Sequence, residues 1–126
     1  RRNKMIKGKI HRSCPLVNLQ VVWSQTTQDV EAIIDTGFTG EIKVPPQMID
    51  DLGLKVTHTQ QVTLGDSRKV DFLASVAYVS LDGIKNLVNV LVAPGDVLIG
   101  VELLQKFKMV LNADFKKNSL ILYKSE

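Results

Sequence analysis

The chain has 126 residues, of which 44% are hydrophobic and 23% are charged, and its formal net charge is +3. This length suits one folded domain with a single core and is too short for two. No apolar run reaches the roughly 20 residues of a membrane-spanning helix, and no charged-then-apolar leader resembles a signal peptide. These properties predict an ordinary globular domain.

The weak positive charge comes from the first four residues. Arg1, Arg2 and Lys4 precede Met5, which resembles a natural start. We therefore interpret residues 1–4 as a leader or a remnant of expression, and residues 5–126 as the single domain. Without those three positive charges the net charge falls from +3 to zero, and the other basic residues alternate with acidic ones. The sequence predicts neither a nucleic-acid partner nor a membrane partner.

The content of metal-binding and redox-active residues is low. Cys14 is the only cysteine, so one chain can form neither an internal disulfide nor a multi-cysteine zinc site. We expect a cytoplasmic location, because a lone cysteine suits a reducing compartment. His11 lies three residues before Cys14, but without a third orienting group we interpret Cys14 as a packed or surface thiol. No His-Glu-x-x-His motif and no phosphate-binding loop occur, so we expect neither a metal nor a cofactor.

Strand patterns dominate the chain in sequence order. Alternation or short apolar runs predict strands at 5–10, 17–23, 30–34, 41–44, 62–64, 69–74, 75–81, 87–92, 109–111 and 120–123. Turns are predicted at 25–28, 65–68, 82–83 and 116–119. Short helices are predicted at 47–52, between Pro46 and Gly53, and at 101–107. Many short strands with two short helices predict an all-β protein with a closed or folded-over sheet.

The most informative segment is 32–40, which reads Ala-Ile-Ile-Asp-Thr-Gly-Phe-Thr-Gly. An apolar strand ends at Asp35, which leaves a carboxylate close to apolar surroundings where it needs a partner or a shared proton. Two aspartates that share one proton can activate a water between them. Thr36 could hydrogen-bond across the base of such a site, and Gly37 would allow a sharp turn that brings its amide to the carboxylates. One chain has a single Asp-Thr-Gly, so the second aspartate would come from a second copy.

Two further motifs follow in a fixed order. A β-hairpin with its turn at Gly65-Asp66 is predicted to close over a substrate and to offer backbone groups to an extended peptide. The apolar pair Leu98-Ile99 and Gly100 then lead into the second helix. Gly100 would permit close backbone packing beneath the Asp35 loop, where a side chain would push that loop away.

In this order the motifs resemble the retropepsin-like aspartic proteases, the dimeric relatives of pepsin. The resemblance covers about residues 5–124 and is greatest to cellular prokaryotic members, which share the Asp-Thr-Gly-Phe-Thr-Gly form followed by a strand, prolines and a short helix. The chain departs from viral members in three places. Those often carry acidic residues at the places of Thr39 and Gly40, a charged residue at the place of Val101, and a glycine-rich hairpin turn.

The resemblance implies a closed β-barrel of the acid-protease type with a flap hairpin, and a homodimeric aspartic endopeptidase acting on extended peptide or protein substrates. The catalytic residues would be Asp35, Thr36 and Gly37, with no metal. The chain ends at 5–10 and 120–123 would help to form the dimer sheet. Leu98 and Gly100 would support the catalytic loop, and the substrate-binding residues would be Phe38, Thr39, Gly40, Leu64, Gly65, Asp66 and Ile99.

Three other interpretations stay open on sequence alone. Asp-Thr-Gly is also an ordinary exit from a strand into a turn, and we interpret Asp66, Asp82 and Asp96, each directly beside a glycine, as turn residues rather than catalysts. The same fold could be a catalytically silent dimerisation or peptide-binding module, because a fold does not specify an activity. A small basic barrel that binds nucleic acid is a weaker alternative, since clustered exposed aromatics and a basic stripe are missing from the sequence.

Overall fold

The computed structural model describes residues 5–126, so the interpretation of residues 1–4 lies outside the described part. Strands predominate, which confirms the predicted all-β class. In residues 5–126 no helix is long and apolar enough to cross a membrane. In chain order the elements are β1 (Met5–His11), β2 (Cys14–Trp23), β3 (Thr26–Ile34), β4 (Ile42–Val44), α1 (Pro46–Leu52), β5 (His58–Thr63), β6 (Lys69–Leu81), β7 (Ile84–Val92), β8 (Leu98–Ile99), α2 (Val101–Lys106), β9 (Met109–Asp114) and β10 (Ser119–Lys124).

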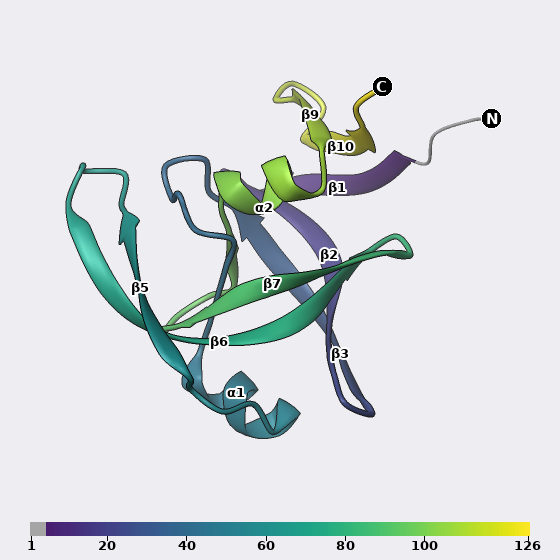
Figure 1. Cartoon of the computed structure of the whole chain (residues 1–126). Helices are drawn as coiled ribbons and strands as arrows, with labels where there is room; N and C mark the ends of the chain where they lie inside the picture. Colours follow the sequence, from purple (N-terminus) through teal and green to yellow (C-terminus); the bar gives the residue numbers. More distant parts are fainter. Residues whose placement is uncertain (1–4) are drawn as a thin grey trace.

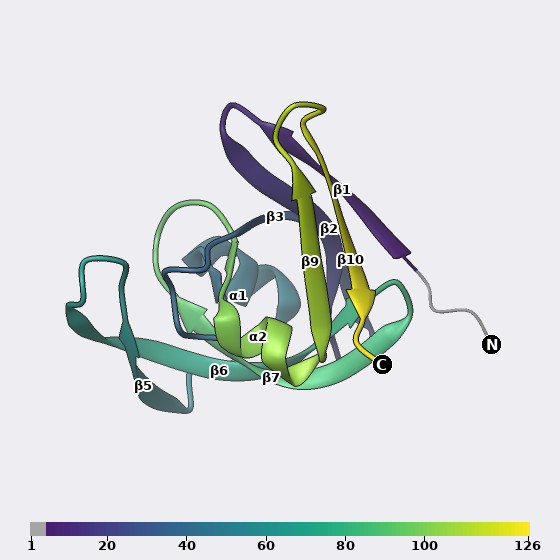
Figure 2. The same ribbon diagram turned by 90° about the horizontal axis from the view of Figure 1, so that it is seen from above.

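The strands form one sheet that closes on itself (Figures 1 and 2). Their order is β5-β6-β7-β4-β8-β3-β2-β1-β10-β9, and β2 also pairs with β6. The strands from β6 to β2 therefore make a ring, which confirms the predicted closed sheet. Alternate residues of these strands fill the ring, and Val21, Val79 and Ile99 among them have no exposed surface.

The turn between β2 and β3 is tighter than predicted. β3 begins at Thr26, so the predicted turn at 25–28 shrinks to Ser24 and Gln25, and the polar start of β3 pairs with β2. Ser24 has a φ of 54°, the left-handed conformation that favours a two-residue hairpin turn. Threonine suits an exposed strand because it is β-branched, so polarity alone placed this boundary wrongly.

β6 is one continuous strand where the pattern predicted two. Its first half pairs with β5, its second half pairs with β2, and β7 pairs with it along 73–81. Ala74 and Ser75 are consecutive and both buried, because the strand passes from one set of neighbours to the next at this point. The strict alternation of a strand with one buried face is lost there, which made a single strand look like two.

The two helices lie at opposite ends of the ring (Figure 1). α1 begins at Pro46 and ends at Leu52, and Gly53 follows as its left-handed cap with a φ of 70°, in agreement with the predicted stop. α2 follows Gly100 and lies beside the connection from β3 to β4. The β5–β6 hairpin projects beyond the ring on the same side as α2 (Figure 1).

Candidate active site

Asp35 begins the connection between β3 and β4, which we call the site loop (residues 35–41). β3 pairs in parallel with β8, and the Asp35 N–H continues this ladder by donating to Ile99 O at 2.9 Å. The carboxylate therefore leaves the sheet at a fixed point, where Asp35 is half-buried. The position of Asp35 is set by the apolar end of β3, which forms backbone hydrogen bonds with β2 on one edge and with β8 on the other.

The turn after Asp35 orients its carboxylate. Gly37 N–H donates to Asp35 Oδ1 at 3.0 Å, and Phe38 N–H donates to Asp35 O at 3.1 Å. Thr36 and Gly37 are exposed. The outer side of the turn is thus accessible to a substrate or to a second chain, while one oxygen of the carboxylate already has an amide partner.

The β5–β6 hairpin lies against this turn. Thr39 N–H donates to Thr63 O at 3.3 Å, and Thr63 N–H donates to Thr39 Oγ1 at 3.0 Å. A Cβ atom added to Gly37 would lie 3.2 Å from Gly65 Cα. Thr39 therefore connects the site loop to the hairpin, and the hairpin turn is folded over the Asp35 turn within the single chain.

Asp66 stabilises the hairpin turn itself. Its Oδ1 accepts the Arg68 N–H at 3.1 Å, and its Oδ2 pairs with Arg68 Nε at 2.6 Å. The backbone bond from Arg68, followed by the bond from the Arg68 side chain, lowers the pKa of Asp66 from its ordinary value of 3.8. The pKa of Asp66 is lower in the folded chain than in the unfolded chain. The bonds between Asp66 and Arg68 therefore contribute fully to the stability of the fold above pH 3.8, and this contribution is lost as the pH falls through the lower folded pKa.

Gly100 packs directly beneath the site loop. Gly100 N–H donates to Glu41 O at 3.0 Å, and the next amide, of Val101, donates to Phe38 O at 2.9 Å. A Cβ atom on Gly100 would lie 2.2 Å from Gly40 O and 2.5 Å from Phe38 O. The φ of Gly100 is −104°, so available space, and not backbone conformation, restricts this position to glycine.

Several predicted substrate contacts lie inside the chain instead of at its surface. Phe38 and Ile99 are 2% and 0% exposed, and Phe38 packs with Val62, Ala74 and Leu91 under the site loop. Gly40 is buried as well, and a Cβ added there would lie 2.6 Å from the Phe38 ring. These residues support the loop from below, since the apolar side chain that follows the turn points back into the protein. Of the predicted set, Leu64 and Leu98 are half-buried, Thr39 is partly accessible, and Gly65 and Asp66 are exposed.

A cavity of about 340 Å³ lies beside β3. Glu31 and Ile33 of β3 line it. The remaining lining residues are His11, Arg12, Cys14, Leu16 and Asp96. In residues 5–126 no group of three or more histidine, cysteine or acidic side chains could hold a metal ion.

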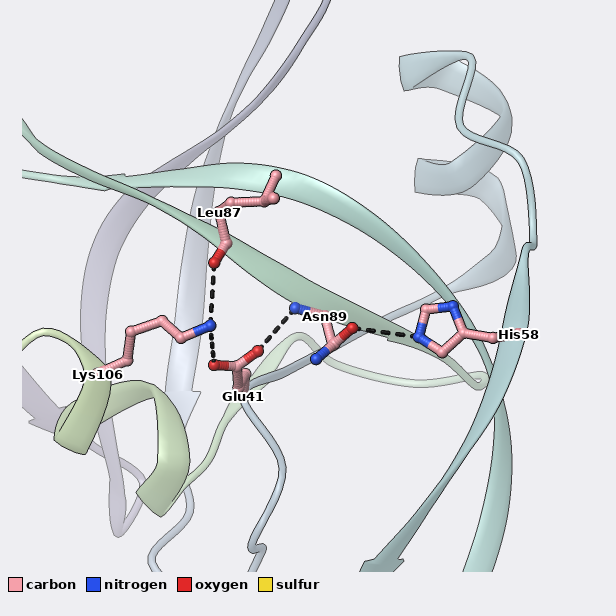
Figure 3. Close-up of polar contacts among 5 residues, drawn as sticks. All are labelled: Glu41, His58, Leu87, Asn89 and Lys106. Atoms are coloured by element: carbon pink, nitrogen blue, oxygen red, sulfur yellow. Dashed lines mark hydrogen bonds and ion pairs between the residues drawn. The ribbon is translucent and has the colours of Figure 1, made fainter.

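Two buried charges near the site loop were missed by the sequence analysis. Glu41 is 4% exposed and pairs with Lys106 Nζ at 2.6 Å (Figure 3). Lys43, which is 7% exposed, donates to Pro94 O at 3.1 Å and also to Asp96 O. Burial lowers the pKa of Lys43 from its ordinary value of 10.5, while the charge of Asp96 acts in the opposite direction. Glu41 and Lys43 alternate with Ile42 and Val44, a pattern that normally indicates a strand with one exposed polar face, so no local signal indicated their burial.

Comparisons with known proteins indicate the family and the fold of this chain. The model of the aspartyl protease family matches residues 19–103, more than half of the chain, including the site loop, the hairpin and Gly100. Among solved structures, the chain is similar to a retropepsin-like aspartic protease from Rickettsia conorii, with a TM-score of 0.67 and 20% identity, over 99% of this chain and 94% of that one. No curated protein matches the chain. The predicted retropepsin-like fold is confirmed, and the chain belongs to the aspartyl protease family.

Proposed function

We propose that the protein is a homodimeric aspartic endopeptidase, which hydrolyses peptide bonds with Asp35 from each of two subunits and one activated water. The supporting observation is the half-buried Asp35 carboxylate, which accepts the Gly37 N–H at the end of a parallel strand pair, in a turn that lies against the β5–β6 hairpin. Membership in the aspartyl protease family supports the same chemistry. Since each chain has one such carboxylate, a second copy would complete the site.

In the proposed dimer the two Asp35 carboxylates face each other across a twofold axis. Two like charges at close distance do not both ionise easily, so the pair holds one proton. The ionised carboxylate takes a proton from the water, whose oxygen adds to the peptide carbonyl carbon, while the protonated carboxyl donates a hydrogen bond to the carbonyl oxygen. The tetrahedral intermediate then breaks its carbon–nitrogen bond as a proton reaches the leaving amine. No covalent intermediate with the protein forms.

The edge of β9 supports self-association. Among residues 5–126, β9 pairs only with β10, so its outer edge is unpaired. The stretch 109–113 carries no charge and no proline, and Leu111 and Phe115 are 36% and 72% exposed. An apolar edge without such protection readily accepts another strand. Figures 1 and 2 show the β9–β10 hairpin, α2 and the β3–β4 connection along one side of the molecule, where one partner could reach all of them.

This arrangement refines the predicted dimer sheet. β10, which contains 120–123, already lies between β1 and β9 of its own chain. It therefore has no free edge for a partner, and we propose that β9 makes the contact between subunits. The substrate would be an extended peptide held between the hairpin and the Asp35 turn, because an extended chain can bond to backbone groups on both. A cytoplasmic location is also part of this proposal and rests on the lone Cys14.

Enzyme concentration provides the direct test of this function. We expect cleavage of a synthetic peptide mixture, followed by mass spectrometry between about pH 3 and pH 8, in which a carboxylate pair can hold one proton. The specific activity should rise with protein concentration and level off once the dimer forms. A protein that dimerises and binds peptides but cleaves none over this range would instead be a silent peptide-binding module. A specific activity independent of concentration in a monomeric protein would contradict the shared site.

Substitution of Leu111 by lysine tests the β9 edge. Two β9 edges that meet would then carry like charges, so we expect the dimer dissociation constant to rise about tenfold or more, with a matching loss of specific activity. The fold should persist, because Leu111 is partly exposed. Sedimentation equilibrium and circular dichroism measure both effects. Val56→Lys is the matched control, since Val56 is 45% exposed between α1 and β5 and should leave the dimer unchanged. Equal dimerisation of both variants would exclude β9 as the interface.

A further inference from the structure

Glu41 has an unusual set of partners for the last residue of the site loop. Its Oε1 accepts the backbone N–H of Asn89 at 2.7 Å, and its Oε2 pairs with Lys106 Nζ at 2.6 Å (Figure 3). Lys106 Nζ donates in addition to Leu87 O at 3.0 Å. One acidic and one basic side chain thus each bind a backbone group of β7.

These backbone groups lie on the edge of β7 that β4 occupies further along. β4 pairs in parallel with β7 only over Ile42–Val44, and Ala93 N–H donates to Val44 O at 3.1 Å. Every second residue of a strand presents its backbone groups to the same edge, so Leu87 and Asn89 face this edge as well. They lie where β4 would continue if the chain did not turn away into the site loop. The Glu41 carboxylate and the Lys106 ammonium therefore replace the missing strand as acceptor and donor.

The same two residues hold the site loop against α2 at both ends of the helix. At the start of α2, Gly100 N–H donates to Glu41 O and Val101 N–H donates to Phe38 O. Lys106 is the last residue of α2, and its side chain returns to Glu41. Asp35 belongs to the same assembly, because its N–H donates to the carbonyl that directly precedes Gly100. A rotation of the loop relative to α2 would have to break the ion pair.

We infer that Glu41 and Lys106 are a positioning pair, which fixes the site loop against α2 and so sets the location of the Asp35 carboxylate. They act through Gly100 and Phe38, and neither residue is assigned a contact with the substrate. The Glu41 carboxylate is almost completely buried, so loss of Lys106 leaves a buried acid with one amide bond, whereas loss of Glu41 leaves a lysine whose side chain is 37% exposed. The catalytic consequence rests on the proposed function, but the structural consequence does not.

Amide hydrogen exchange of the full chain, measured by NMR, tests the structural part. In Glu41→Gln and in Lys106→Met we expect protection of the Asp35, Gly100 and Val101 amides to fall about tenfold, with changes below about twofold in the β1–β10 pair. Lys106→Met keeps the Glu41 bond to Asn89, which provides a second variant if Glu41→Gln does not fold. Glu31→Gln is the matched control, because Glu31 forms an exposed ion pair with Lys9 at 3.3 Å.

Kinetics on the same variants test the catalytic part. We expect kcat to fall about tenfold with KM within about twofold, because a displaced acid impairs the chemical step while the hairpin contacts with a peptide persist. The kcat of the double variant should be no lower than that of the less active single variant, since both substitutions break the same interaction. Glu31→Gln should retain the wild-type values.

The outcomes separate this inference from the proposed function. Unchanged exchange at the Asp35, Gly100 and Val101 amides would overturn the positioning pair, whatever the activity. A uniform loss of protection over the whole chain would also overturn it, because the pair would then contribute only to global stability. If the wild type cleaves no peptide and equals Asp35→Asn, the proposed peptidase fails, and the exchange pattern alone decides on the pair.

Discussion

Asp35→Asn is expected to reduce peptide hydrolysis by about 1,000-fold or more, because a dimer of this variant has neither a general base nor a proton to share. The asparagine side chain has nearly the same size, and its oxygen can still accept the Gly37 N–H that Asp35 Oδ1 accepts at 3.0 Å. The fold and the dimer should therefore be retained. The rate of product formation, measured beside sedimentation and thermal unfolding, separates loss of chemistry from loss of structure. Undiminished hydrolysis by this variant would refute the proposed mechanism.

Mixing the two proteins provides a sharper form of the same experiment. With a ninefold excess of Asp35→Asn and free exchange of subunits, only about one tenth of the wild-type subunits would pair with each other. The activity per wild-type subunit should fall by the same factor, since a mixed dimer has one carboxylate in place of two. A wild-type subunit that keeps its full activity in the mixture would show that a single chain holds a complete site.

Gly100→Ala is expected to produce the largest loss of stability, about 3 kcal/mol in the free energy of unfolding. The added Cβ would lie 2.2 Å from Gly40 O and 2.5 Å from Phe38 O, and these are backbone atoms that cannot move aside as a flexible side chain could. Phe38 O also accepts the Val101 N–H, so the clash and the loss of this bond occur together. Urea unfolding with a linear extrapolation measures the effect.

Gly65→Ala is the matched control for stability. No atom lies within 4 Å of a Cβ added to Gly65, and the residue is exposed in the hairpin turn. We expect a change below about 0.5 kcal/mol, which is typical of surface substitutions. Equal stability of the two alanine variants would mean that the site loop and α2 separate easily. Asp35 would then not be rigidly held, because its ladder bond to Ile99 O lies next to Gly100.

Local sequence patterns were sufficient to predict many elements of this fold. An apolar run that ends in Asp35-Thr36-Gly37 predicts a strand followed by a sharp turn, and the structure has β3 ending at residue 34 with the Gly37 amide on the carboxylate. Pro46 and Gly53 delimit α1 because their effects on the backbone act within one helical turn. The repeated short strands indicated a closed or folded-over sheet, since strands with one apolar face bury it by packing against other strands.

Burial of charge and the pairing of strands depend instead on residues far apart in the sequence. Glu41 meets Asn89 across 48 residues, and Lys43 meets Pro94 across 51. No local pattern contains these partners, so the sequence indicated that both charged side chains were exposed, whereas the closed sheet buries them. Phe38 likewise turned inward because β5, β6 and β7 supply the cluster that receives it. The amino-acid order thus specified where Asp35 leaves its strand, whereas long-range packing buried the charges and the aromatic ring around the site loop, because only folding brings their partners together.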